Sequence, residues 1–144
     1  MTQHDLVFSS IAALAPRIAA QEVSPVAVTE AILARIEQLD RRLNAYITVT
    51  AERARQAARA AEAAIRSGNY LGPLHGIPVA VKDLFATRGV RTTFGSPLFA
   101  DWIPEYDATV VERLKRAGAV LLGKTNLHEL AFGTTSANVH YGPV

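Results

Sequence analysis

The chain has 144 residues, no cysteine and a formal net charge of +2, and 49% of its residues are hydrophobic. This length and apolar content fit one globular domain with its own core and exclude a disordered chain. The basic residues are interleaved with acids and alanines, which argues against direct nucleic-acid binding, and the lack of cysteine excludes a thiolate nucleophile in this segment.

No segment approaches the roughly 18 consecutive apolar residues of a membrane span. The N-terminus, residues 1–5, lacks the basic region of a signal peptide, and Arg17 would interrupt an apolar run. We therefore expect a cytoplasmic protein without a membrane partner.

The first half of the chain has the periodicity of helices. Ser9 or Ser10 can cap a helix that runs to about Ala20, and Ser24 followed by Pro25 is a stronger start signal for the next helix. Apolar residues then recur at steps of three or four and predict one buried stripe: Val28, Ile32, Ile36, Leu39 and Leu43.

A short strand is predicted over residues 45–49. Thr50 can then cap an alanine-rich helix that runs through Ala54, Ala57, Ala61 and Ile65 and ends at Gly68. The narrow alanine face of this helix predicts close packing on a neighbour. Residues 1–70 are therefore expected to be mainly helical.

The pattern changes after Gly72. Residues 77–82 predict a strand with Pro78 near its start, and residues 88–106, rich in Gly, Pro, Thr and aromatic residues, predict a long connection. A buried strand is predicted over residues 119–122.

Between these strands Asp107 is expected to cap a helix that Gly118 ends, with Val110, Val111, Leu114 and Ala117 facing inward. The order strand, helix, strand predicts that residues 71–144 are an α/β portion: part of a mixed, largely parallel sheet covered by helices.

Residues 118–125, Gly-Ala-Val-Leu-Leu-Gly-Lys-Thr, match the G-x-x-x-x-G-K-[ST] pattern of a phosphate-binding loop. That chemistry needs free backbone amides between the glycines, with a strand before them and a helix after them. Here a helix comes first and the intervening residues are predicted to be the strand itself. We therefore expect a helix-ending glycine and a core strand, and a nucleotide-binding module stays only as an alternative.

The sequence His128-Glu129-Leu130-Ala131-Phe132 begins like the H-E-x-x-H zinc helix. Phe132 occupies the position of the second histidine, and one imidazole does not make a zinc site. We expect no metal site and a surface histidine in a loop or first helical turn.

Lys82 ends the apolar strand and is the candidate catalytic residue. A lysine at a strand end is usually exposed to water. In an apolar setting made by Val81, Leu84 and Phe85, its charged form would be disfavoured, and a neutral amine can deprotonate a hydroxyl nucleophile. The residues alone leave both interpretations open.

Five ordered blocks between Gly72 and Gly142 resemble the N-terminal part of the amidase signature family. They are Gly72-Pro73-Leu74-His75-Gly76-Ile77-Pro78-Val79-Ala80-Val81-Lys82-Asp83, Gly89-Val90-Arg91-Thr92-Thr93, Tyr106-Asp107-Ala108-Thr109-Val110-Val111, residues 117–126, and Phe132-Gly133-Thr134-Thr135. The resemblance covers about half of the chain, and helices also precede these blocks in that family. It implies that residues 1–144 are the N-terminal portion of a single amidase signature domain.

In that family a lysine at the position of Lys82 is the general base and acid, working through a serine on a cis peptide that relays the proton to a nucleophilic serine. Both serines lie in downstream Gly/Ser-rich segments, and no serine of this chain has such a context. The resemblance also implies that Ala131, Phe132 and Gly133 line the substrate cleft. Ala137 stands where relatives often have glutamate.

The sequence thus predicts the front part of an amidase, which hydrolyses a small-molecule carboxylic amide through an acyl-serine intermediate without metal or cofactor. The 144-residue segment alone is expected to be inactive. An alternative is the glutaminase (A) subunit of a tRNA-dependent amidotransferase, with amidotransferase subunits as partners; otherwise a homo-oligomer is possible. The stretches 83–85 and 94–96 look more like free-standing amidases, which favours the first interpretation. A non-catalytic α/β module is the alternative of another class.

Overall fold

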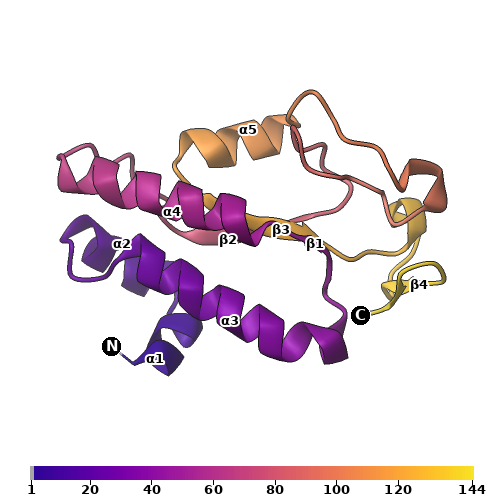
Figure 1. The fold of residues 1–144 in the computed structure, drawn as a ribbon, viewed down its shortest axis with the longest axis horizontal. Coiled ribbons are helices and arrows are strands. Elements are labelled where there is room, and N and C mark those ends of the chain that lie inside the picture. Colours follow the sequence, from indigo (N-terminus) through magenta and orange to yellow (C-terminus); the bar gives the residue numbers. More distant parts are fainter. Residues whose placement is uncertain (1) are drawn as a thin grey trace.

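The computed structural model describes residues 2–144, without the side chains of residues 3 and 4. Helices dominate the first half, and strands and long connections the second (Figure 1). The elements in order are α1 (Gln3–Phe8), α2 (Ile11–Ala19), α3 (Pro25–Leu43), β1 (Tyr46–Val49), α4 (Ala51–Arg66), β2 (Pro78–Lys82), the 3₁₀ turn η1 (Pro97–Phe99), α5 (Thr109–Arg116), β3 (Val120–Thr125), the 3₁₀ turn η2 (Glu129–Ala131), β4 (Ala137–Asn138) and β5 (Gly142–Pro143).

Two of the predicted helix starts are confirmed. The Ser10 hydroxyl accepts the Ala13 amide at 3.2 Å at the start of α2, and Ser24 does the same for Ala27 at 3.1 Å at the start of α3. Thr50 precedes α4 as predicted, but it makes no side-chain cap, because its hydroxyl donates to the Leu121 carbonyl at 3.3 Å.

The predicted strands form a mixed three-stranded sheet in the order β1-β3-β2. β2 and β3 are parallel, with Lys82 opposite Thr125, whereas β1 is antiparallel to β3, with Tyr46 opposite Thr125. The sheet is therefore less parallel than the strand–helix–strand order suggested, because β1 from the helical half supplies a strand of opposite direction. β1 and β2 are the edge strands within the described residues.

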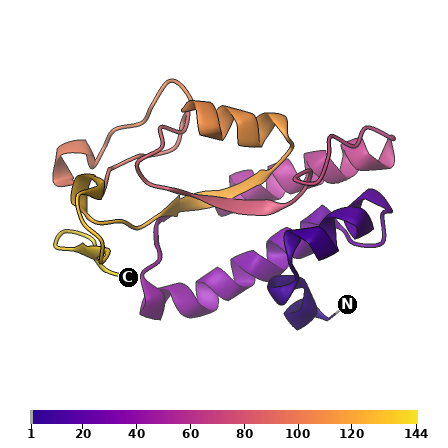
Figure 2. The ribbon, with the colours of Figure 1, turned by 180° about the vertical axis from the view of Figure 1, so that it is seen from behind.

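Helices lie on both faces of this sheet. Figures 1 and 2 show α3 on one side of the sheet and α5 on the other. Apolar residues fill the interior below the sheet in two adjoining clusters. One joins α2 and α3 to Ile65 and Ile77, and the other joins α3 and α4 to β3 through Leu33, Ala54, Ala58, Val120 and Leu122. The predicted close packing of the alanine face of α4 is confirmed for Ala54, Ala61 and Ile65, but Ala57 is exposed and Ala58 is buried in its place.

The predicted details of α5 are wrong in two respects. Ala108, not Asp107, occupies the cap position. The Asp107 carboxylate instead accepts the Arg88 amide at 2.7 Å and pairs with Lys115 at 2.7 Å, so it joins α5 to the connection before it. Of the four residues expected to face inward, Val111 is fully buried but Val110 is 40% exposed.

Within residues 2–144 no helix is both long enough and apolar enough to cross a membrane.

Candidate functional site at the end of strands β2 and β3

Lys82 is the last residue of β2, and its side chain is exposed. The preceding residue, Val81, is 5% exposed and points into the interior, because successive side chains of a strand face opposite ways. The apolar wall expected around the Lys82 amine is therefore not formed by the described residues. Within residues 2–144 the amine also has no hydrogen-bond or ion-pair partner.

The segment predicted to line the substrate cleft is a strained turn. Leu130 and Ala131 have φ angles of 52° and 60°, the left-handed region that residues with a Cβ rarely adopt. Phe132 follows with 90% of its surface exposed. Gly133 packs so closely on the His128 ring that a Cβ there would overlap it. This packing and the turn hold Phe132 outward.

Backbone hydrogen bonds connect this segment to the end of β2. The Asp83 amide donates to the Thr125 carbonyl at 3.0 Å, the Phe94 amide to the Asp83 carbonyl at 3.0 Å, and the Leu130 amide to the Phe94 carbonyl at 2.7 Å. In Figure 1 the connection that follows β2 and the connection that follows β3 both leave the sheet at the end that lies away from α2. Lys82 and residues 131–133 therefore belong to the same end of the sheet, with residues 93–96 between them. The carboxyl ends of parallel strands are where ligands bind in open α/β sheets.

Behind Lys82 lies a buried ionic network that sequence analysis missed. Lys124 of β3 is 1% exposed and Asp83 is fully buried, and the Lys124 ammonium lies 3.1 Å from Asp83 Oδ1. Lys124 also donates to the Phe85 carbonyl at 2.9 Å and to the Thr92 hydroxyl at 2.7 Å. Asp83 Oδ2 accepts the amide and the hydroxyl of Thr93 at 2.8 and 2.6 Å.

The electrostatics of Lys124 follow from this burial. Desolvation lowers the pKa of Lys124, and the neighbouring Asp83 carboxylate opposes that shift. The Lys124 ammonium faces only acceptors: a carboxylate, a carbonyl and a hydroxyl oxygen. One signal in the sequence was available, because a lysine inside a buried strand requires an acidic partner, and Asp83 follows the neighbouring strand.

A second polar group supports the strained turn. A hydrogen bond from Ser96, which is fully buried, is the main cause that lowers the pKa of Glu129, and the nearby His140 adds to the effect. The His140 ring lies 3.2 Å from the Glu129 carboxylate. These contacts fix the start of η2 against residues 94–96.

The phosphate-loop match is resolved as predicted. β3 occupies most of the phosphate-loop match, and the amide of Val120 bonds to Ile77, so these amides are not free to hold phosphate. His128 lies just before η2, but it is only partly exposed and its Nδ1 is buried, so it is not the surface histidine that was predicted. No group of three or more possible metal ligands occurs among the described residues.

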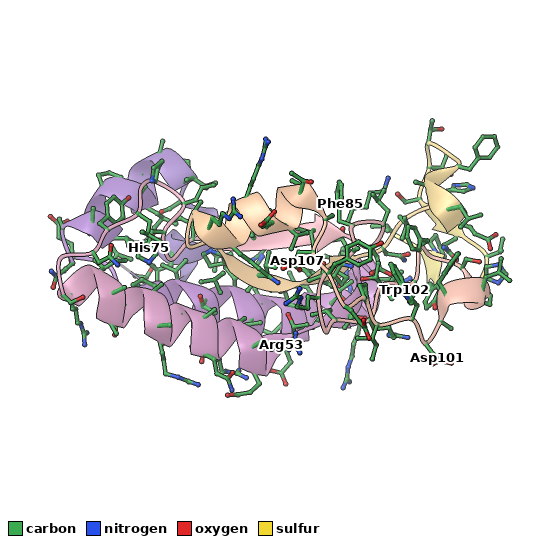
Figure 3. The ribbon with its side chains drawn as sticks, turned by 90° about the horizontal axis from the view of Figure 1, so that it is seen from above. Arg53, His75, Phe85, Asp101, Trp102 and Asp107 are labelled. Atoms are coloured by element: carbon green, nitrogen blue, oxygen red, sulfur yellow. The ribbon has the colours of Figure 1, made fainter. Side chains whose placement is uncertain are left out.

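A cavity of about 130 Å³ lies between α4 and α5, lined by Arg53, Val81, Lys115 and Leu121, among others. Figure 3 shows Arg53 and Asp107 beside this part of the molecule, with His75 toward its other end. Because Val81 lines the cavity and Lys82 faces the opposite way, the cavity is separate from the Lys82 site.

Comparison with known proteins places these features in a family. A model of the amidase family matches residues 27–144. Two glutamyl-tRNA(Gln) amidotransferase A subunits are similar over most of the chain. The one from Azotobacter vinelandii is 53% identical over 94% of this chain and 28% of its own length. The one from Streptomyces coelicolor is 48% identical over 96% of this chain and 28% of its own length.

A solved peptide amidase from Stenotrophomonas maltophilia superposes with a TM-score of 0.86 at 35% identity, covering 94% of this chain and 29% of the other. The chain thus spans a little over a quarter of the length of the relatives it matches. It belongs to the amidase signature family.

Proposed function

We propose that this chain is the N-terminal portion of the glutamine-hydrolysing A subunit of a tRNA-dependent amidotransferase. The similarity to amidotransferase A subunits, 48–53% identical over nearly the whole chain, is the observation that carries this proposal. It reverses the preference drawn from residues 83–85 and 94–96. These short stretches weigh less than identity over more than 90% of the chain.

In this proposal Lys82 is the general base and acid. Its position at the end of β2, beside a strained turn that presents Phe132, supports a role at a cleft. Among residues 2–144 no acidic side chain pairs with this amine, so no ion pair holds it away from the cleft. The hydroxyl groups that complete the reaction, a relay serine and a nucleophilic serine, lie outside these 144 residues.

The chemistry proceeds through two acyl transfers. The neutral Lys82 amine takes a proton, through the relay serine, from the nucleophilic serine, which attacks the side-chain amide of glutamine. The C–N bond breaks when the protonated lysine returns that proton to the departing nitrogen, and ammonia leaves. Water then attacks the acyl-serine with the same lysine as base, which releases glutamate. Ala131, Phe132 and Gly133 line one wall of the cleft.

The test is glutamine hydrolysis by the full-length protein, assembled with its partner subunits. Lys82→Ala should lower kcat for ammonia release by about 10²–10⁴-fold or more while the fold persists. Lys82→Arg should lower kcat nearly as much, because a guanidinium stays protonated near neutral pH. Lys115→Ala, which removes an exposed lysine on α5, is the matched control and should keep normal turnover.

A free-standing amidase is the second candidate, supported by the likeness to the solved peptide amidase. The two candidate functions differ in the substrates and partner subunits that the activity needs. An amidotransferase subunit should need its partners to convert glutamyl-tRNA(Gln) with glutamine as the nitrogen donor. Rapid hydrolysis of simple amides by the full-length protein alone, with no transfer to tRNA in the presence of partners, would select the second candidate. Near-normal turnover by Lys82→Arg would contradict the base role in either case.

A further inference from the structure

The buried pair Asp83–Lys124 is placed to act on Lys82. Asp83 directly follows Lys82 in the chain, and Lys124 stands on the adjacent strand opposite Val81, one register step from the Thr125 that pairs with Lys82. Both members of the pair are at most 1% exposed. Water therefore screens the charges of Asp83 and Lys124 weakly from each other, although the Lys82 amine itself is exposed.

Asp83 Oδ1 depends on Lys124 alone for compensation. Oδ2 is satisfied by the amide and the hydroxyl of Thr93, but within residues 2–144 no hydrogen-bond donor is aligned on Oδ1. The only cation within ion-pair distance of that oxygen in the described chain is the Lys124 ammonium, at 3.1 Å. Without Lys124 a buried carboxylate next to Lys82 would be unbalanced.

The same pair fixes the course of the backbone after Lys82. Lys124 holds the Phe85 carbonyl and the Thr92 hydroxyl, and the Asp83 side chain holds Thr93. These contacts clamp both ends of the connection that leaves β2 and returns beside it. Lys82 therefore ends a strand whose next residues cannot shift without breaking ionic contacts.

Other charged groups lie near β2 and are engaged. Arg53 and Lys115 line the same cavity as Val81 and Lys124; Arg53 donates to the Arg88 carbonyl at 3.3 Å, and Lys115 pairs with Asp107 at 2.7 Å. In the connection, Arg91 donates to the Ile47 carbonyl and to the Thr48 hydroxyl, both at 3.2 Å. On α3, which packs against β2, Glu30 bonds Arg55 at 2.8 Å. The remaining charged residues of α3 are Arg35, Glu37, Asp40, Arg41 and Arg42.

We propose that Asp83 and Lys124 are positioning residues for Lys82: they anchor the end of β2 and cancel each other's charge, so that Lys82 can act as a neutral base. This inference rests on the proposed role of Lys82 in amide hydrolysis. It assigns Lys124, which matches a phosphate-loop motif in sequence, a role in the hydrolytic site. Neither residue touches the substrate.

If the two charges compensate each other, removal of either one should shift the pH profile of the full-length enzyme in a defined direction. The assay is glutamine hydrolysis measured across pH. Lys124→Met leaves an uncompensated anion that favours the Lys82 ammonium, so the acidic limb of the kcat/KM profile should move up by about one pH unit. Asp83→Asn leaves an uncompensated cation, so the acidic limb should move to lower pH. The double variant Asp83→Asn/Lys124→Met should return the limb to its wild-type position.

The controls separate this effect from stability. Lys115→Met removes a lysine whose side chain is 41% exposed from a Lys–Asp pair of similar length, and it should leave the limb unmoved. Each variant is checked for folding by circular dichroism and thermal melting. If Lys124→Met does not fold, Asp83→Asn and the double variant still give the two decisive positions of the limb.

Two failures are distinguishable. If Lys82→Ala keeps its turnover, the proposed function of Lys82 is wrong, whatever the pair does. If Lys82→Ala is inactive but the folded Lys124→Met or Asp83→Asn variant keeps the wild-type limb, the positioning role is wrong and the pair only supports the fold. An acidic limb of the double variant that differed from the wild-type position would also contradict the proposal that the two charges compensate each other.

Discussion

The two ends of this molecule are stabilised by different kinds of contact. The helical part is held by apolar side chains such as Ile18 and Val28, which are fully buried. In the connections beyond the sheet the buried groups are mostly polar, whereas Leu98, Phe132 and Val139 are more than 80% exposed. The helical scaffold thus gains its stability from apolar burial, whereas the loops around Lys82 gain a defined course from hydrogen bonds.

A cavity in the helical part should have the largest effect on stability. Ile18→Ala removes a fully buried side chain from the cluster of α2, α3 and β2, and the free energy of unfolding should fall by about 3–4 kcal/mol. Ile11 lies on the same helix but is 45% exposed, so Ile11→Ala is the matched control. Denaturant unfolding measures both. Equal losses from the two variants would show that apolar burial does not distinguish this region.

Loss of a polar anchor should have a smaller effect, concentrated in the loops. The buried Asn138 amide donates to the Gly95 and Leu127 carbonyls at 2.7 and 2.9 Å and accepts the amides of His140 and Tyr141 at 2.8 and 2.9 Å. Asn138→Ala should cost about 2 kcal/mol.

Hydrogen exchange should locate the effect of Asn138→Ala in residues 94–96 and 126–144, with α2 and α3 unchanged. Asn69→Ala, at an exposed position, is the control. A loss of protection that spread evenly through the helices would contradict the division between the two regions.

The smallest effect should come from pH, through His75 at the boundary between helices and sheet. Burial lowers the pKa of His75, and its Nδ1 accepts the Leu71 amide at 3.1 Å, so the folded protein holds the neutral ring. The unfolded chain binds the proton more readily. Stability should therefore be complete above the unfolded value of about 6.5 and fall as pH decreases toward the lower pKa of the folded state.

Unfolding free energies measured from pH 8 to 5 test this sign. His75→Asn can keep the accepted hydrogen bond without a titrating ring, so its stability should change less over the same range. A wild-type stability that rose on acidification through this range would contradict a neutral buried His75.

Features set by neighbouring residues could be predicted from the sequence, whereas features set by residues far apart in the chain could not. Helix starts were found because Ser10, Ser24 and Pro25 act on their immediate neighbours. β2 and β3 were found because short apolar runs bounded by glycine or proline are local patterns. Asp107 was misassigned as a cap because its partners, the Arg88 amide and Lys115, lie outside the turn it was expected to close. Residues far apart in sequence set those contacts.

The candidate site was found only in part for the same reason. Lys82 and residues 131–133 were chosen by family resemblance, and the structure brings them to one end of the sheet. The Asp83–Lys124 pair was missed because it joins two strands separated by the whole of α5 and its connections. The amidotransferase relationship depends on identity spread over the chain, which two short stretches did not represent.

The register of β1 has a consequence for the order of folding. β1 pairs only with β3 among the described strands, with Tyr46 opposite Thr125. At typical synthesis rates β3 is made on the order of 4–15 s after β1. By the end of that interval α1–α4 have been synthesised, but the apolar residues of α3 and α4 that pack against β3 still lack this strand. The nascent chain therefore exposes these apolar residues of α3 and α4 for seconds, which gives chaperones time to bind them.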